Sequence, residues 1–128
     1  MKVISDDIKK GEFKSVYLLY GEEEYLKKQY RDRLKNAIAG DDTMNYSYYD
    51  SDNASVKDII DVCETLPFFA QKRLVIMENT GFLKSSNDEL ADYIKHIPDY
   101  LVVVMVEKDV DKRNKVSSML LLALLMAM

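Results

Sequence analysis

Residues 101–106 read Leu101-Val102-Val103-Val104-Met105-Val106, an apolar run without a single polar side chain. Such a run is typical of a strand that is covered on both faces, as strands are in parallel sheets. Residues 16–20 and residues 74–77 have the same character and predict two further buried strands. Residues 44–49 are rich in tyrosine and predict a fourth strand, which we expect nearer an edge of the sheet because its alternate residues share one face.

Segments with helical spacing separate these strands. Residues 22–38 carry apolar side chains at helical intervals and predict the first helix. Residues 55–58 resemble a capping box and open a second helix that Pro67 ends, because the residue before a proline avoids the helical conformation. Residues 86–89 form a clearer capping box and open a third helix, closed by Pro98. The order βαβαβαβ predicts an α/β fold: a mostly parallel sheet with helices on both faces.

The composition is that of an ordinary globular domain. The chain has 128 residues, of which 48% are apolar and 31% charged, and it contains no linker or repeat. Its net charge of −4 excludes a global field that would attract nucleic acid. The single cysteine, Cys63, excludes an intrachain disulfide and a multi-cysteine zinc site. Because the first residues lack the apolar stretch of a signal peptide, we expect a protein of the reducing cytoplasm.

The last residues do not fit this picture. Residues 119–128 contain no polar group, yet they are too few to span a bilayer as a helix. Three explanations stay open: a buried helix, a helix that packs on another copy of the chain, or the altered end of a shortened chain. We favour the last, and expect one domain over residues 1–116 followed by an apolar tail over residues 117–128.

The turn after the first strand lies where a P-loop nucleotide enzyme binds phosphate. A P-loop needs a second glycine, a lysine for the β- and γ-phosphates and a Ser/Thr for Mg²⁺, and we expect none of the three here. Gly21 is instead followed by three carboxylates, Glu22, Glu23 and Glu24, which occupy the positive end of the helix dipole and would repel an anion. We interpret this turn as a degenerate phosphate loop. Glu78, which ends an apolar strand without a second acid beside it, is interpreted as a surface residue rather than a magnesium ligand.

Other candidate residues favour structural roles. His96 has no second ligand nearby, and Cys63 lies on the apolar face of the second helix, where we expect it in the core. A basic cluster near the end of the last strand is diluted by two aspartates and is interpreted as a solvated turn; its members are Lys108, Lys112, Arg113 and Lys115. We therefore expect no catalytic residue, no cofactor and no metal site.

Residues 65–73 contain two adjacent phenylalanines, Phe68 and Phe69, between a helix end and a strand. Adjacent side chains of an extended segment point in opposite directions, so one ring could enter the core while the other faces outward. An exposed pair of this size, with basic residues at its rim, would be a candidate anchor for a protein interface. From the spacing alone, packing of both rings under the loop is the favoured interpretation.

Several segments in order resemble the N-terminal domain of the delta subunit of the bacterial DNA polymerase III clamp loader, over roughly residues 10–116. The first two are the more specific. The segments are Tyr17-Leu18-Leu19-Tyr20-Gly21-Glu22-Glu23, Thr65-Leu66-Pro67-Phe68-Phe69, Lys72-Arg73-Leu74-Val75, Phe82-Leu83, Leu101-Val102-Val103-Val104 and Asp111-Lys112-Arg113-Asn114-Lys115.

This resemblance implies a fold of the AAA+ type and a subunit that does not hydrolyse ATP. It also implies a role in DNA replication: binding the ring-shaped sliding clamp, the beta subunit, and holding one of its interfaces open. In the family a hydrophobic pair after the second helix enters the pocket of the clamp. On this chain the pair corresponds to Phe68 and Phe69, with Leu66 and Pro67 shaping the approach, so the resemblance reverses the interpretation from spacing.

The resemblance further implies a place within a DNA-directed DNA polymerase holoenzyme, a transferase, without catalysis by this chain. DNA binding would be indirect, through the assembled loader, and no membrane is involved. Family members continue into a helical domain and a collar that contacts the other loader subunits; we expect this chain to bind the clamp without that assembly. Two alternatives stay open: a P-loop-like nucleotide enzyme, and a scaffold that dimerises through the apolar tail.

Overall fold

The computed structural model describes residues 2–82 and 88–108. Four strands form one parallel sheet in the order β1-β4-β3-β2. The strands are β1 (Val16–Tyr20), β2 (Tyr46–Tyr49), β3 (Arg73–Glu78) and β4 (Leu101–Glu107). The helices are α1 (Lys2–Lys10), α2 (Glu24–Ile38), α3 (Val56–Cys63) and α4 (Asp88–Ile94). The predicted α/β fold with a parallel sheet is confirmed.

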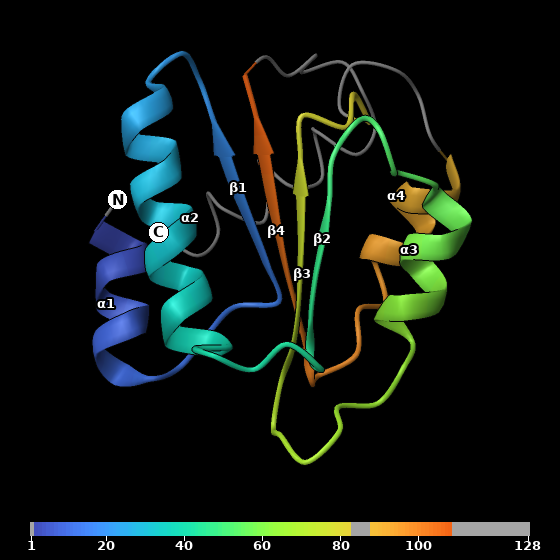
Figure 1. The fold of residues 1–128 in the computed structure, drawn as a ribbon, viewed down its shortest axis with the longest axis horizontal. Coiled ribbons are helices and arrows are strands. Elements are labelled where there is room, and N and C mark those ends of the chain that lie inside the picture. Colours follow the sequence, from blue (N-terminus) through green and yellow to red (C-terminus); the bar gives the residue numbers. More distant parts are fainter. Residues whose placement is uncertain (1, 83–87, 109–128) are drawn as a thin grey trace.

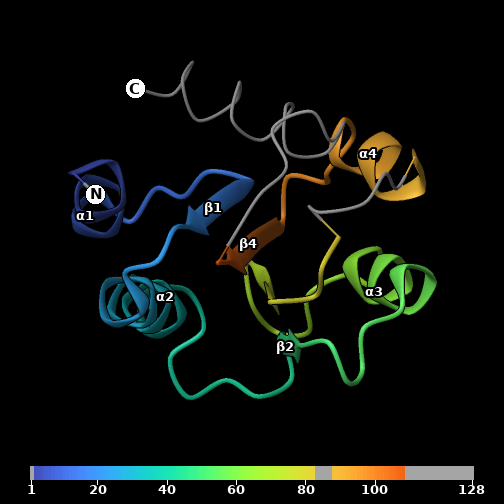
Figure 2. The same cartoon turned by 90° about the horizontal axis from the view of Figure 1, so that it is seen from above.

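The molecule has three layers, with the sheet in the middle (Figure 1, Figure 2). Helices α1 and α2 cover one face, and α3 and α4 cover the other. Alternate residues of β4 divide between the two faces: Val102 and Val104 pack with Leu34 of α2, whereas Val103 and Met105 pack with Ile59 of α3. The continuous apolar run in β4 is therefore explained by a strand that is buried on both sides.

The position of β2 at an edge of the sheet agrees with its tyrosine-rich sequence. Its side chains are only partly buried, whereas those of β3 and β4 are almost all buried. Strand β1 forms the other edge of the described sheet, yet its three central residues are buried: Tyr17 and Leu19 pack in the cluster that includes Ile4 of α1, and Leu18 packs in the cluster on the opposite face.

Helix α1 was not predicted. Ile4 and Ile8 pack it against the core, and the carboxylate of the buried Asp7 accepts hydrogen bonds from the Tyr17 hydroxyl at 2.6 Å and from Lys14 Nζ at 2.8 Å. Burial and the neighbouring Asp7 carboxylate raise the pKa of Tyr17. These contacts link residues in different elements, so helical spacing within α1 could not indicate them.

Several element ends differ from the prediction. Helix α2 begins at Glu24, and α3 ends at Cys63, before Pro67. Ser55 occupies the N-cap position of α3 in an extended conformation, but its side chain makes no capping hydrogen bond, so the expected capping box is not formed. Helix α4 ends at Ile94, ahead of the predicted end at Pro98.

Some predictions fall on residues that the structure does not describe. They are the capping residues 86–87, the basic residues Lys112, Arg113 and Lys115, and the apolar tail over residues 117–128. Within residues 2–82 and 88–108, no helix has the length and apolar character required to cross a membrane.

Candidate functional site

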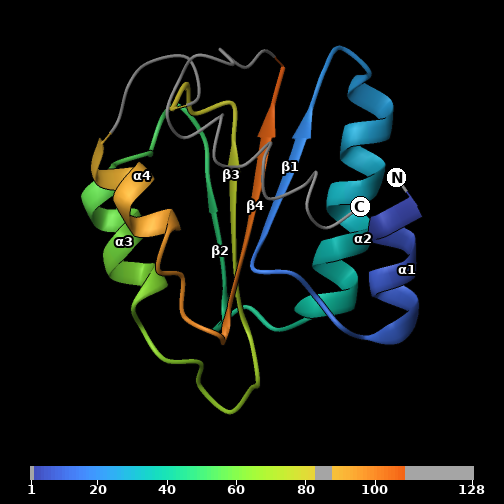
Figure 3. The ribbon, with the colours of Figure 1, turned by 180° about the vertical axis from the view of Figure 1, so that it is seen from behind.

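The two segments singled out in the sequence lie at opposite ends of the parallel strands. We call the side of the sheet where the strands end the carboxyl edge, and the side where they begin the amino edge. Gly21 follows the carboxyl end of β1, so the turn that carries it lies at the carboxyl edge. The loop of residues 64–72 leads from α3 into the start of β3 and lies at the amino edge. In Figure 1 this loop projects beyond the starts of the strands, and Figure 3 shows the same projection from behind. We call residues 64–72 the recognition loop.

The carboxyl edge contains a lysine that the sequence analysis missed. Lys27 stands six residues after Gly21, which is the spacing of the lysine in the P-loop pattern G-x-x-x-x-G-K-[ST]. The prediction that no such lysine is present is therefore wrong. The other two requirements are absent: Leu26 stands in place of the second glycine, and Lys28 in place of the Ser/Thr.

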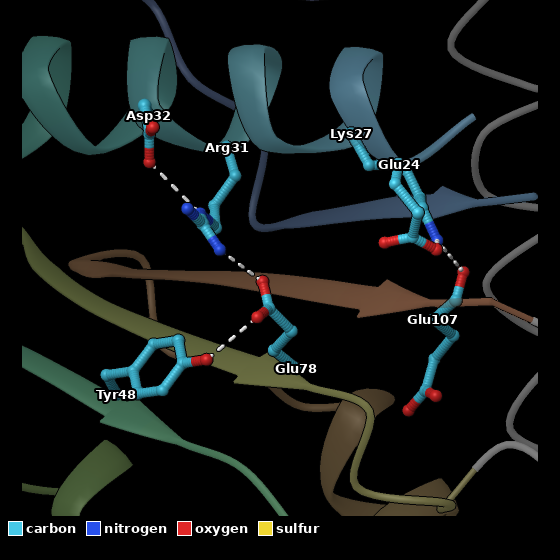
Figure 4. Close-up of polar contacts among 7 residues, drawn as sticks. All are labelled: Glu24, Lys27, Arg31, Asp32, Tyr48, Glu78 and Glu107. Carbon is cyan, nitrogen blue, oxygen red and sulfur yellow. Dashed lines mark hydrogen bonds and ion pairs between the residues drawn. The ribbon is translucent and has the colours of Figure 1, made fainter. Parts of the chain in front are cut away.

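The Lys27 ammonium is nonetheless hydrogen-bonded to other groups of the chain (Figure 4). Its side chain is buried, and its Nζ donates to Glu24 Oε1 at 2.9 Å and to the main-chain carbonyl of Glu107 at 3.3 Å. The Lys27 ammonium lowers the pKa of Glu24. The carboxylate beside the lysine therefore takes the place that a phosphate group would need. Of the three predicted acids, Glu22 and Glu23 precede the helix, and only Glu24 lies in its first turn.

Glu78 is engaged as well. Its carboxylate forms an ion pair with Arg31 of α2 and accepts a hydrogen bond from the Tyr48 hydroxyl at 2.8 Å (Figure 4). Burial, together with this hydrogen bond, raises the pKa of Tyr48 to about 12. The strand end thus connects α2 to the edge strand β2, and the interpretation of Glu78 as a solvent-facing acid is wrong.

A cavity of ≈ 240 Å³ lies beside this edge, lined by Glu24, Asn79, Gly81, Glu107 and Lys108. The buried Glu107 carboxylate accepts a hydrogen bond from Thr80 Oγ1 at 3.2 Å and turns away from Lys27 in Figure 4. Within residues 2–82 and 88–108, no three His, Cys, Asp or Glu side chains gather as a metal site would require. His96 is exposed, and Cys63 is in the core, where burial raises the pKa of its thiol to about 12.

At the amino edge, the recognition loop exposes large apolar side chains. Leu66 is 72% exposed, Phe68 52% and Phe69 95%, while Pro67 is half-buried. Packing of both rings under the loop, the interpretation favoured by spacing alone, is therefore wrong. The two rings contact each other edge to face, with centroids 4.4 Å apart.

Phe69 adopts a backbone conformation that explains this pair. Its φ is +55°, in the left-handed region that bulky residues rarely enter. A left-handed residue reverses the path of the chain, so the alternation expected of an extended segment does not hold and both rings are exposed. Such strained residues occur where the surrounding structure holds them in place, often at functional sites.

Two buried polar side chains hold the recognition loop. Arg73 is buried, and its guanidinium donates to the main-chain carbonyls of Thr65 at 2.8 Å and Leu66 at 3.3 Å. Arg73 is thus an internal anchor and does not form the expected basic rim. Lys72 lies nearby, with its Nζ donating to the carbonyl of Asp99 at 2.8 Å.

The second anchor, Asn45, directly precedes β2 and is 2% exposed. Its side-chain amide bonds both the N–H and the carbonyl of Phe68, at 2.6 and 2.8 Å. Asn45 in turn donates to Asp42 Oδ2 at 2.7 Å, and this hydrogen bond, with others from the main chain, lowers the pKa of Asp42. The neighbouring Met44 is an exposed apolar side chain at the same edge.

The sequence analysis missed Asn45 as a functional candidate. Asn45 and Phe68 are 23 residues apart and belong to segments on either side of α3, so no local pattern connects them. The predicted strand over residues 44–49 includes Met44. In the structure β2 begins only at Tyr46, so Met44 lies before the strand and is exposed.

These features define a class of protein. The fold is a parallel α/β sheet with helices on both faces. Lys27 and Glu24 pair with each other after β1, and the exposed apolar surface lies at the opposite edge of the sheet. The class that the fold and the site define is therefore a parallel α/β domain with an exposed apolar loop.

Comparison with known proteins identifies the family. A family model for the delta subunit of DNA polymerase III matches residues 17–126. DNA polymerase III subunit delta of Bacillus subtilis is 31% identical, in an alignment that covers 88% of this chain and 36% of the relative. The chain belongs to the DNA polymerase III delta subunit family.

Solved structures agree with this assignment. The clamp loader delta protein of Bacillus subtilis matches with a TM-score of 0.79 and 30% identity, covering 90% of this chain and 38% of that protein. A gamma subunit-related protein of DNA polymerase III from Thermotoga maritima shares the fold, with a TM-score of 0.60 at 12% identity over 82% of this chain and 39% of that one. The chain thus spans between 36% and 38% of the length of its two Bacillus subtilis relatives.

Proposed function

We propose that this chain is the clamp-binding domain of a clamp-loader delta subunit. It binds the sliding clamp through Leu66, Pro67, Phe68 and Phe69 and holds one interface of the ring open, and it does so without hydrolysing ATP. The observation that carries the proposal is the exposure of the aromatic pair, 52% for Phe68 and 95% for Phe69, on a loop anchored by buried side chains.

The pair has the properties of an interface anchor. Two adjacent aromatic rings offer apolar area that stays in water in the free chain, and fully burying one such ring contributes roughly 1.5–3 kcal/mol. Arg73 and Asn45 restrain the backbone on which the rings stand, so less conformational entropy is lost on binding. An apolar pocket on a partner protein is the ligand that such a surface fits best.

The lack of ATP hydrolysis is supported by the carboxyl edge. A phosphate group at the turn after Gly21 would have to displace Glu24 from Lys27 and would meet the carboxylates of Glu22 and Glu23. Glu78, at the end of β3, is paired with Arg31 and Tyr48 and is not placed to hold Mg²⁺.

The remaining parts of the proposal follow from the family. Residues 1–116 form the clamp-binding domain, and residues 117–128 stand outside it. The other loader subunits are partners of the longer subunit, DNA is contacted through the assembled loader, and the cytoplasm is where replication places such a protein.

The test is binding of the chain to an immobilised sliding clamp. We expect the double variant Phe68→Ala, Phe69→Ala to lose binding at all accessible concentrations while its thermal unfolding stays cooperative. The matched control is Tyr25→Ala, which removes an aromatic ring of 77% exposure from the carboxyl edge and is expected to bind normally. Equal affinity of the double variant and the native chain would refute the proposal.

A calorimetric titration with Mg-ATP tests the second part of the proposal. We expect no heat of binding from the native chain. A saturable heat would show that the turn after Gly21 still accepts a nucleotide, and the proposal that this domain works without ATP would then fail.

A further inference from the structure

We propose that Asn45 is a positioning residue that holds Phe68 and Phe69 in their binding geometry before a partner arrives. This inference rests on the proposed function, because it takes the aromatic pair as the contact surface for the clamp. Asn45 is 2% exposed and its hydrogen bonds to the loop go to the main chain of Phe68, so it acts through the loop and not by contact with the partner.

The geometry resembles the pairing of two strands. Asn45 Oδ1 accepts the Phe68 N–H at 2.6 Å, and Asn45 Nδ2 donates to the Phe68 carbonyl at 2.8 Å and to Asp42 Oδ2 at 2.7 Å. Both amide protons and the amide oxygen are thus used, and the opposite orientation of the amide would place donor against donor and acceptor against acceptor. The amide fixes the peptide groups on both sides of Phe68, immediately before the left-handed Phe69.

The amide is not required for the sheet. The main chain of Asn45 extends the pairing of β2 with β3 by one hydrogen bond, because its carbonyl accepts the Leu74 N–H at 2.9 Å. A side chain of any kind at position 45 leaves that bond in place. The two hydrogen bonds between Asn45 and Phe68 are only partly buried, so water can reach the peptide groups of Phe68 when the amide is removed. Loss of the amide should therefore release the recognition loop without unfolding the domain.

The recognition loop has little else to hold its centre. Leu66, Phe68 and Phe69 are exposed and bury little apolar area, and the Arg73 side chain bonds only the carbonyls of Thr65 and Leu66, near the start of the loop. A loop that samples many conformations binds with an apparent affinity reduced by the fraction that is competent. We therefore expect Asn45→Ala to weaken clamp binding by about 5- to 30-fold, a range set by a competent fraction between a few and twenty per cent.

The experiment compares four variants of the chain for affinity to the immobilised clamp, for thermal unfolding and for the proton resonances of the phenylalanine rings. They are Asn45→Ala, Asn45→Asp, the double variant Phe68→Ala, Phe69→Ala, and the control Asn53→Ala. Asn53 is a matched control because its side chain also accepts a main-chain N–H, that of Asp50, but in a turn at the carboxyl edge. For Asn45→Ala we expect the weaker binding given above, little change in the unfolding temperature, and loss of the ring-current shift that the edge-to-face pair produces.

Asn45→Asp adds a readout that a merely structural role would not produce. A carboxylate at position 45 cannot donate to the Phe68 carbonyl and faces the carboxylate of Asp42, with the Arg73 guanidinium as the charged group nearby. Once protonated, it can donate one hydrogen bond again. We therefore expect its affinity, relative to the native chain at the same pH, to be low at pH 8 and to recover in part toward pH 5.

The outcomes separate this inference from the proposed function. If the double phenylalanine variant loses binding but Asn45→Ala binds within twofold of the native chain, the inference is overturned and the proposed function stands. If the double variant binds normally, the proposed function fails, and the ring resonances of Asn45→Ala decide whether the amide positions the pair at all: an unchanged ring-current shift overturns the inference. If Asn45→Ala does not fold, the pH profile of Asn45→Asp decides, and a flat profile overturns it.

Discussion

Phe69 allows a test in which stability and binding move in opposite directions. Its φ of +55° places a bulky side chain in the left-handed region, which costs an ordinary residue roughly 1–2 kcal/mol. Because Phe69 is 95% exposed, it repays little of this cost by burial within the chain. We therefore expect the residue to be unfavourable for folding and favourable for binding.

The substitutions Phe69→Asn and Phe69→Ala isolate the strain. Both remove the contact with the Phe68 ring, so that loss cancels when the two variants are compared. Asparagine tolerates the left-handed conformation and alanine does not, so Phe69→Asn should be more stable than Phe69→Ala by about 0.5–1 kcal/mol. For a chain of 128 residues this corresponds to an unfolding temperature higher by roughly 2–5 °C.

Clamp binding should not follow this order. Either variant removes the more exposed of the two rings, and burying one phenylalanine contributes roughly 1.5–3 kcal/mol. We expect both to bind the clamp about 10- to 150-fold more weakly than the native chain, since 1.4 kcal/mol corresponds to a factor of ten. The assays are differential scanning calorimetry and binding to an immobilised clamp. Equal unfolding temperatures for the two variants would show that the left-handed backbone is not maintained in solution, and unchanged affinity would show that Phe69 is not an anchor.

Three further predictions concern the residues that hold the two edges. Arg73→Leu leaves two loop carbonyls without their donor and should lower the free energy of unfolding in urea by about 1–3 kcal/mol, with weaker clamp binding; full clamp affinity would contradict the role of Arg73 as an anchor. Lys27→Ala should destabilise the chain by a similar amount, about 1–3 kcal/mol, because it empties a buried position, but should leave clamp affinity unchanged, and a parallel loss of affinity would contradict the separation of the edges. The pKa of Asp42 is lowered in the folded chain, so its stabilising effect is present above its unfolded pKa and is lost as the pH falls through the folded value. The difference in unfolding temperature between the native chain and Asp42→Asn should therefore shrink from about pH 5 toward pH 3, and a constant difference would contradict this assignment.

The fold was largely predictable because its core depends on a pattern that each strand carries by itself. Strand β4 is apolar at every position up to Val106, and burial on both faces is the simplest explanation of that pattern. Helix α1 was not predictable in the same way. Its apolar side chains, Ile4 and Ile8, do lie four residues apart and pack in the core, but the helix is only nine residues long, and its contact through Asp7 with Tyr17 and Lys14 is tertiary.

The candidate site was predictable in its residue types but not in its geometry. The aromatic pair stands out in the sequence, yet its exposure depends on the left-handed φ of Phe69. A phenylalanine gives no indication of a left-handed backbone in the sequence. The anchoring by Asn45 joins segments that are separated by a whole helix, and only the folded chain brings them together. The lysine of the degenerate phosphate loop was different, since counting six residues from Gly21 to Lys27 was enough to find it.

The two edges of the sheet differ in what they offer to a ligand. Parallel α/β sheets usually bind their ligands at the carboxyl ends of the strands. In this chain internal ion pairs, Lys27 with Glu24 and Arg31 with Glu78, hold charged side chains at that edge, while the amino edge carries the exposed rings. Strands of five to seven residues, at about 3.3 Å per residue, separate the edges by roughly 17–23 Å. Changes at the amino edge should therefore alter the exposed surface without disturbing the pairs at the carboxyl edge, because the buried strand β4 lies between the two.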